Sequence, residues 1–225
     1  MTMLRPECYQ TPIVESLYDL QNIEHTFNLH AGFELKKSNL INAFREELLE
    51  LQTALTDSPV DSLALSSEVA DNLIYIFSLA NFFSFDFETS LIQIQGLDKN
   101  QFNFGGYLKT FAAGDACNPE QLLSLQQKSG QICQKSGAVL VNYLSQPAVN
   151  NSILQKIAVE HFNHLLQLAQ LYHLDVLKIL SRKINRNFYK YANFKERVAS
   201  GLDFVQARAA TKSAWPPGED ENFLR

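Results

Sequence analysis

The sequence contains few of the residues that end helices and form turns. It has nine glycines and seven prolines, 16 residues in 225, or about 7% against roughly 12% in average proteins. A β-sandwich or β-barrel needs a turn about every 8–12 residues, so this scarcity argues against a predominantly β fold. The Gly105-Gly106 pair is not followed by the lysine and the serine or threonine of a phosphate-binding P-loop.

Basic residues and long apolar runs are scarce as well. The 19 lysines and arginines are outnumbered by 24 aspartates and glutamates, which gives a net charge of −5, so we expect no nucleic acid as a partner. The most apolar stretch, residues 69–85, is interrupted by polar residues. It is also shorter than the roughly 20 residues that span a membrane, so we expect no membrane-spanning segment.

Only three cysteines are present, Cys8, Cys117 and Cys133, and no two of them form a CxxC pair. An odd number without this spacing is typical of reduced thiols rather than of a disulfide framework or a zinc site. Residues 1–9 lack the apolar core of a signal peptide. We therefore expect a cytoplasmic protein.

Apolar residues recur at helical spacing along most of the chain. Between residues 38 and 56, for example, Ile41, Phe44, Leu48 and Leu51 follow one another at intervals of three and four, which predicts one buried helix face. Ser38 is expected to cap this helix. The predicted helices span about residues 12–29, 38–56, 66–83, 86–96, 119–143, 151–172 and 175–189. We expect an all-α helical bundle, with residues 95–119 as its longest irregular connection.

Two segments of the sequence are similar at an offset of 89 residues. Residues 79–87 and 168–176 each end an apolar helix, turn, and start a new helix at an aspartate. This indicates a degenerate internal duplication, although any two amphipathic helices joined by a short turn would look alike. The expected organisation is one all-α domain over residues 1–205, with pseudo-repeats at about 10–105 and 106–200, followed by a mobile C-terminal tail at 206–225.

The most informative residues are acidic and lie on two successive predicted helices. Glu47 and Glu50 are three residues apart on the first helix, as are Glu68 and Asp71 on the second, so each pair shares a helix face. If the helices pack antiparallel, as a short loop favours, the four carboxylates converge. Such an oxygen-only site suits Mg²⁺ or Mn²⁺. Acidic pairs at this spacing also occur on solvated helix faces.

The order of these acidic residues resembles a family signature. The string Glu46-Glu47-Leu48-Leu49-Glu50, a gap of 17 residues, and then Glu68-Val69-Ala70-Asp71 is similar to the motif of the all-α nucleoside triphosphate pyrophosphohydrolases. That superfamily includes the MazG-like proteins and the dimeric dUTPases. The resemblance covers about residues 20–100 and extends more weakly to the basic helix end at residues 177–191.

The resemblance implies a MazG-like core and an activity. It implies hydrolysis of a (d)NTP to (d)NMP and pyrophosphate with Mg²⁺ as cofactor and Mn²⁺ as its substitute, in the cleaning of the nucleotide pool. The four carboxylates would hold the metal, and Glu50 would take the proton of the attacking water. The remaining candidates would contact the nucleotide: Glu46, Asn72, Lys99, Lys183, Arg186 and Lys190. The chain's one tryptophan, Trp215, lies far from the acidic motif, unlike the tryptophan-rich surroundings of that motif in the dUTPases, which speaks against specificity for uracil.

Several features have a second interpretation. Nine of the 19 basic residues lie between 178 and 212, where they either approach a triphosphate or form a solvated face. His161 and His164 have a spacing that can hold a transition metal, but no third ligand stands at motif spacing. A homodimer would be needed to close the bundle of a single helical unit, whereas a duplicated chain would close it alone.

The alternative function is a non-catalytic helical module for nucleotide sensing or protein interaction. At the 89-residue offset, the four metal-binding positions correspond to Ser136, Val139, Ile157 and Glu160, so the second half lacks the acidic motif. Carboxylates that pair with lysine or arginine, instead of converging, would favour this alternative.

Overall fold

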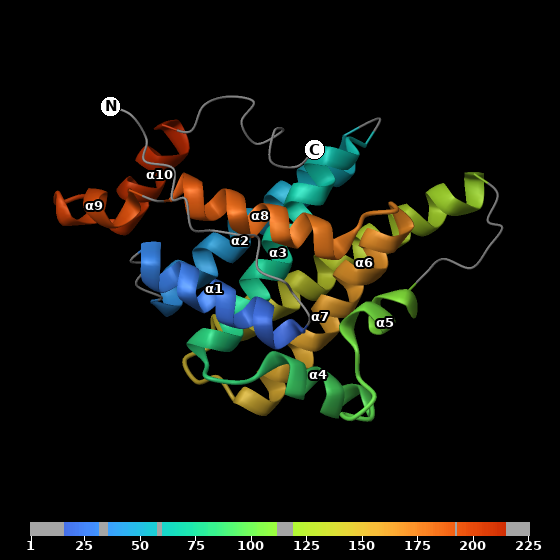
Figure 1. Cartoon of the computed structure of the whole chain (residues 1–225). Helices are drawn as coiled ribbons and strands as arrows, with labels where there is room; N and C mark the ends of the chain where they lie inside the picture. Colours follow the sequence, from blue (N-terminus) through green and yellow to red (C-terminus); the bar gives the residue numbers. More distant parts are fainter. Residues whose placement is uncertain (1–15, 32–35, 58–59, 112–118, 192, 215–225) are drawn as a thin grey trace.

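The protein is described by a computed structural model that covers residues 16–31, 36–57, 60–111, 119–191 and 193–214 (Figure 1). Within these ranges all regular elements are helices and there is no β-strand, which confirms the prediction of an all-α bundle. The helices are α1 (Leu17–Ala31), α2 (Lys37–Thr56), α3 (Ser62–Phe82), α4 (Phe87–Gln95), α5 (Phe104–Lys109), α6 (Pro119–Leu144), α7 (Asn151–Leu171), α8 (Val176–Lys190), α9 (Phe194–Ala199) and α10 (Phe204–Ala214).

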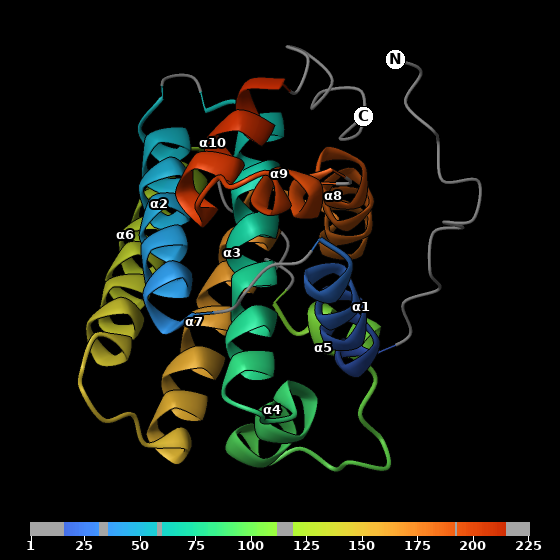
Figure 2. The same cartoon turned by 90° about the vertical axis from the view of Figure 1, so that its left-hand side faces the viewer.

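Four long helices form the centre of the bundle (Figure 2). Helix α2 packs against α3 and α6, and α7 packs against α3 and α6, so each of the four contacts two others. Their apolar faces supply a continuous core that includes Phe44, Leu51, Leu73 and Phe162. Helices α1 and α8 pack on α3 from outside, and α4 packs on α7 and α1. The core thus draws on both halves of the chain.

Helix starts follow capping residues where the sequence offers them. The Asp86 carboxylate accepts a hydrogen bond from the Thr89 N–H and caps α4, as predicted. Helix α3 begins at Ser62, earlier than predicted, because Asp61 caps it by accepting from the Leu63 N–H. Helix α2 begins before Ser38, and the cap expected at this serine is wrong: residue Lys36 occupies the N-cap position without a side-chain hydrogen bond.

Two segments expected to be irregular contain helices. Helix α5 lies within the connection at 95–119 and is stabilised by burial of Phe104 and Leu108, with Asn103 as its cap. Helix α10 occupies part of the segment that the sequence assigns to a mobile tail starting at 206. The tail prediction overlooked that Ala207 and Thr211, one helical turn apart, are buried. Residues 215–225 of the expected tail lie outside the described residues.

The 89-residue offset also relates backbone features of the two halves. Helices α3 and α7 have 21 residues each and start 89 residues apart. Each is followed by a residue with positive φ, Ser84 at 55° and His173 at 56°. The next N–H groups then donate to equivalent carbonyls: Phe85 to Ala80 at 3.0 Å and Leu174 to Ala169 at 2.8 Å. The sequence similarity is therefore matched by similar local structure.

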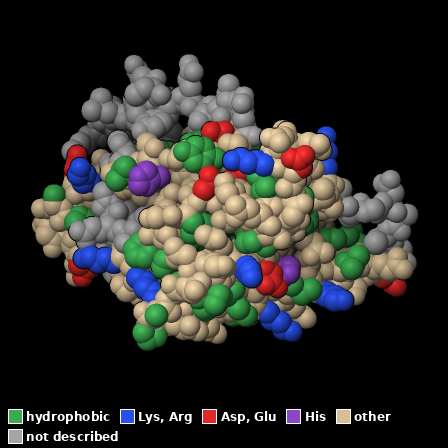
Figure 3. Space-filling model, turned by 90° about the horizontal axis from the view of Figure 1, so that it is seen from below, with side chains coloured by type: hydrophobic (Ala, Val, Ile, Leu, Met, Phe, Trp, Pro, Cys, Tyr) green, Lys and Arg blue, Asp and Glu red, His purple; other side chains and the backbone are tan. Residues whose placement is uncertain are grey.

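Among the described helices, α3 is the one that is long and apolar enough to cross a membrane by length and composition. Its most apolar window is 72% buried inside the protein, as is typical of a central core helix. On the face of the molecule in Figure 3, basic, acidic and hydrophobic side chains of the described residues are interspersed.

Candidate metal centre

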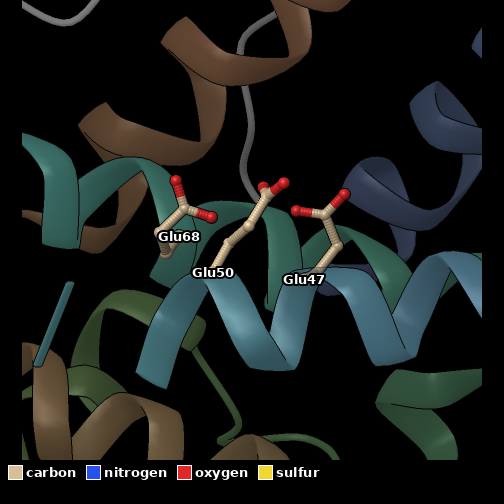
Figure 4. Close-up of side chains that lie close together, drawn as sticks. All are labelled: Glu47, Glu50 and Glu68. Carbon is tan, nitrogen blue, oxygen red and sulfur yellow. The ribbon is translucent and has the colours of Figure 1, made fainter. Parts of the chain in front are cut away.

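Three carboxylates from two helices converge on one side of the bundle. Glu47 and Glu50 lie one turn apart on α2, and Glu68 lies on the neighbouring helix α3. Each offers one oxygen, and these oxygens lie within 4.8 Å of one another (Figure 4). Oxygens that share one Mg²⁺ lie about 3–4 Å apart, given metal–oxygen distances near 2.1 Å. Small side-chain rotations would therefore bring these carboxylates to one cation.

Two carboxylates of this triad, Glu47 and Glu68, lie in an environment that disfavours their negative charge. Burial raises the pKa of Glu47 well above its usual range, and the charges of Asp71 and Glu50 raise it further. Burial and the charge of Asp71 raise the pKa of Glu68 to about 7. Atom Oε2 of Glu47 and Oε2 of Glu68 are buried without a hydrogen-bond partner among the described residues. Ionised carboxylates that are buried and lack hydrogen-bond partners destabilise the fold. A bound cation would offset this cost by pairing with their negative charge.

Asp71, the fourth predicted ligand, is not a member of the triad. Its Oδ2 lies 2.6 Å from the Nζ of Lys183 on α8. The same ammonium group donates to the Ser67 Oγ at 2.5 Å, and Lys183 is only 2% exposed. The predicted nucleotide contact Lys183 is therefore a buried residue that joins α8 to α3 through an ion pair.

Arg208 of α10 adds a second positive charge to this region. Its guanidinium forms ion pairs with Glu46 and with Glu47, at 3.0 Å from the Glu47 Oε1. Sequence reasoning counted Arg208 in the basic segment but did not single it out. Its partners are 161 and 162 residues away in the sequence, and no spacing rule connects positions so distant.

The other predicted contacts are spread over the molecule. Asn72 is fully buried and donates to the backbone carbonyls of Glu47 and Glu68, so it ties α2 to α3 directly beneath the triad. Arg186 is buried on α8, and its charge acts against the rise of the Glu68 pKa.

Two further predicted contacts lie at the ends of other elements. Lys190 ends α8 and lies 6.0 Å from the ring centre of Tyr191. Lys99 is exposed in the turn after α4. Helix α4 starts only beyond the C-terminal end of α3, and that end is about 20 Å of helix away from Glu68.

Glu24 on α1 is a buried carboxyl group that sequence reasoning missed. It accepts hydrogen bonds from the Ser78 hydroxyl at 2.6 Å and from the Asn28 amide at 3.0 Å. Burial, with a smaller contribution from Asp71, raises its pKa to about 8. Its position four residues after Leu20 and three before Phe27, on the apolar face of α1, was the available signal.

The histidine pair of α7 does not join a group of three metal-ligating side chains in the described part of the chain. His161 is fully buried, and its Nδ1 lies 2.9 Å from the Ser136 hydroxyl. Because that hydroxyl donates to the Cys133 carbonyl, the histidine Nδ1 is the donor in the pair. Burial lowers the His161 pKa to about 3, which indicates a neutral core residue.

Comparisons of the chain with protein-family models, with curated proteins and with solved structures find no match.

Proposed function

We propose that the chain is a Mg²⁺-dependent nucleoside triphosphate pyrophosphohydrolase, which converts a (d)NTP and water into (d)NMP and pyrophosphate. The observation that carries this proposal is the convergence of Glu47, Glu50 and Glu68. One buried carboxylate oxygen of Glu47 and one of Glu68 have no hydrogen-bond partner in the part of the chain that the structure describes. An all-oxygen, negatively charged group of this kind suits Mg²⁺, with Mn²⁺ as a substitute.

The residues around the triad would divide the work of such a reaction. A bound divalent cation would neutralise phosphate charge and lower the pKa of a water molecule. Glu50 would accept the proton of the attacking water, whose oxygen bonds to phosphorus as the bond to the pyrophosphate leaving group breaks. Lys183 would fix Asp71 beside the triad through their ion pair. Arg186, near Glu68, would interact with the triphosphate.

The architecture supports a MazG-like core built from a repeated helical unit. Helices α3 and α7 and the turns that follow them match at the 89-residue offset. The pair α6–α7 packs on α2–α3 within one chain. Under this proposal a second copy of the protein is not needed to complete the four-helix core, and each chain carries one acidic centre.

Pyrophosphate release by the purified full-length chain, with Mg²⁺ and a panel of canonical and modified (d)NTPs, tests the proposal. We expect turnover of at least one nucleotide and a loss of about 100-fold or more in Glu50→Gln, the scale of general-base contributions. Glu160→Gln is the matched control, because Glu160 is an exposed glutamate of the other helix pair. Absence of turnover with every nucleotide, or an unaffected Glu50→Gln variant, would refute it.

A second candidate is a non-catalytic nucleotide-sensing or protein-interaction module. The ion pairs of Asp71 with Lys183 and of Glu46 and Glu47 with Arg208 favour it, because they show carboxylates neutralised by the protein itself. Titration calorimetry separates the two candidates: nucleotide binding with no product formed over hours supports the sensing module.

A further inference from the structure

Arg208 forms an ion pair with Glu47, a carboxylate that the proposed cation also needs as a ligand. Its guanidinium pairs with Oε1 of Glu47, whereas Oε2 of the same residue is buried and unpartnered among the described residues. Glu47 is only 4% exposed, so the guanidinium and the cation would both contact its carboxylate away from bulk water. An arginine stays protonated at all ordinary pH values, and like charges repel strongly where the surroundings are poorly solvated.

The second partner of Arg208 lies outside the triad. Glu46 pairs with the same guanidinium but contributes no oxygen to the group of three. Arg208 can thus leave Glu47 without losing every partner on α2. A guanidinium released from Glu47 also presents donors that suit the phosphate groups of an incoming nucleotide.

Helix α10 is attached in a way that allows this movement. Its most extensive contacts are with the short helix α9, and Ala207 and Thr211 are its only buried residues among those whose side chains are described. The ion pairs of Arg208 join α10 to α2. Gly201, with φ at 99°, lies in the turn between α9 and α10, where this backbone conformation favours glycine.

We propose that Arg208 is a built-in competitor of the divalent cation: cation binding at Glu47, Glu50 and Glu68 displaces the guanidinium from Glu47 and loosens α10 from α2. This inference rests on the proposed function, because it requires a cation at the triad. It adds a regulatory device, in which Arg208 of α10 neutralises Glu47 until a cation binds. An arginine that merely orients Glu47 for the metal would have the opposite effect on affinity, since its removal would weaken binding.

Titration of the full-length protein with Mn²⁺ alone, followed by the electron paramagnetic resonance signal of the free ion, distinguishes these roles. We expect Arg208→Gln to bind Mn²⁺ about tenfold more tightly than the wild type, within the range usual for coupled binding equilibria. Arg45→Gln is the matched control. Arg45 lies on α2 with Glu47 and Glu50 and donates to the Ser145 hydroxyl. Its removal changes the net charge equally but leaves the Glu46 and Glu47 pairs in place.

Hydrogen exchange of the wild type gives a second measurement that needs no variant. We expect amide exchange in α10 to accelerate when Mn²⁺ is added, while exchange in α7 stays unchanged. Equal or weaker Mn²⁺ binding by Arg208→Gln, or unchanged or slower exchange in α10, overturns the competitor role and leaves the metal site standing. Absence of Mn²⁺ binding by the wild type and by both variants overturns the metal site and this inference together.

Discussion

Helices α3 and α7 share their length, a capped start and the turn that follows them, but the pairs α2–α3 and α6–α7 bury different chemistry. Asp61 caps α3 and Asn150 caps α7, each by accepting from the N–H two residues further on. Yet of the four acidic positions of the first pair, only the position of Asp71 has an acidic counterpart, Glu160, at the 89-residue offset. Similar local backbone structure in α3 and α7 therefore accommodates either set of side chains, and the acidic centre is a property of a few positions.

The interior of the α6–α7 pair is tightly packed and uncharged. A Cβ atom at Gly137 of α6 would lie 2.4 Å from Leu48 Cδ2 and 3.2 Å from His161 Cε1, so α6 approaches its neighbours closely at this glycine. His161 is neutral there. Burial disfavours the charged form of Glu47 and Glu68 in the first pair and of His161 in the second. Among the described residues, only the first pair groups several carboxylates whose charge a cation would stabilise.

The largest expected effect is on Mn²⁺ affinity, which should depend on carboxylates of the α2–α3 pair and not on those of the α6–α7 pair. Glu68→Gln should lower the Mn²⁺ affinity about 100-fold or more, because loss of a direct ligand exceeds the 10- to 100-fold cost of losing an outer partner. Isothermal titration calorimetry measures this change.

Glu160 of α7 lies 89 residues after Asp71 of α3. Glu160→Gln should leave the Mn²⁺ affinity within about twofold of the wild-type value, as expected for an exposed charge. Equal losses in both variants would show that general charge, and not the triad, attracts the cation.

An intermediate effect should appear in the pH dependence of stability. The folded state keeps His161 neutral down to a pKa of about 3, whereas the unfolded chain protonates it near pH 6.5. Between these values protonation of His161 favours the unfolded state, so the contribution of His161 to the free energy of unfolding falls as the pH falls. The carboxyl groups with raised pKa values, Glu24, Glu47 and Glu68, contribute in the opposite direction, because the folded state keeps their protons. The contribution of His161 approaches ~1.4 kcal/mol per pH unit. Urea unfolding at pH 7, 6 and 5 measures it.

The matched variants for this slope are His161→Gln and His25→Gln. His25 is exposed on α1, so its replacement should leave the slope unchanged. His161→Gln should remove the destabilising contribution of His161, so the variant gains stability relative to the wild type as the pH falls from 7 to 5. A slope in His161→Gln equal to that of the wild type would contradict this contribution of His161.

The smallest expected effect concerns the helix caps that α3 and α7 have in common. Asp61→Ala and Asn150→Ala should each lower the free energy of unfolding by ~1 kcal/mol, the usual cost of losing a helix cap. Thermal unfolding followed by circular dichroism measures both. Neither change should alter Mn²⁺ affinity. A much larger loss of stability for one cap would show that the two caps do not contribute equally to the free energy of unfolding.

Local sequence patterns predicted most of the fold because helices depend mainly on nearby residues. Apolar spacing and the cap at Asp86 placed α2, α3, α4, α6, α7 and α8 within a few residues of their observed bounds. The short helices α5 and α10 were missed because six to eleven residues give little periodicity, and because burial of Phe104 and Ala207 depends on distant parts of the chain.

The sequence by itself determined the helical class and the acidic positions, since spacings of three and four residues fix which side chains share a helix face. Tertiary structure alone decided that Glu47, Glu50 and Glu68 converge while Asp71 pairs with Lys183. It also brought Arg208 and Glu24 to this region. The physical reason is that ion pairs and pKa shifts depend on distances between helices and on burial, which packing sets and which no local pattern encodes.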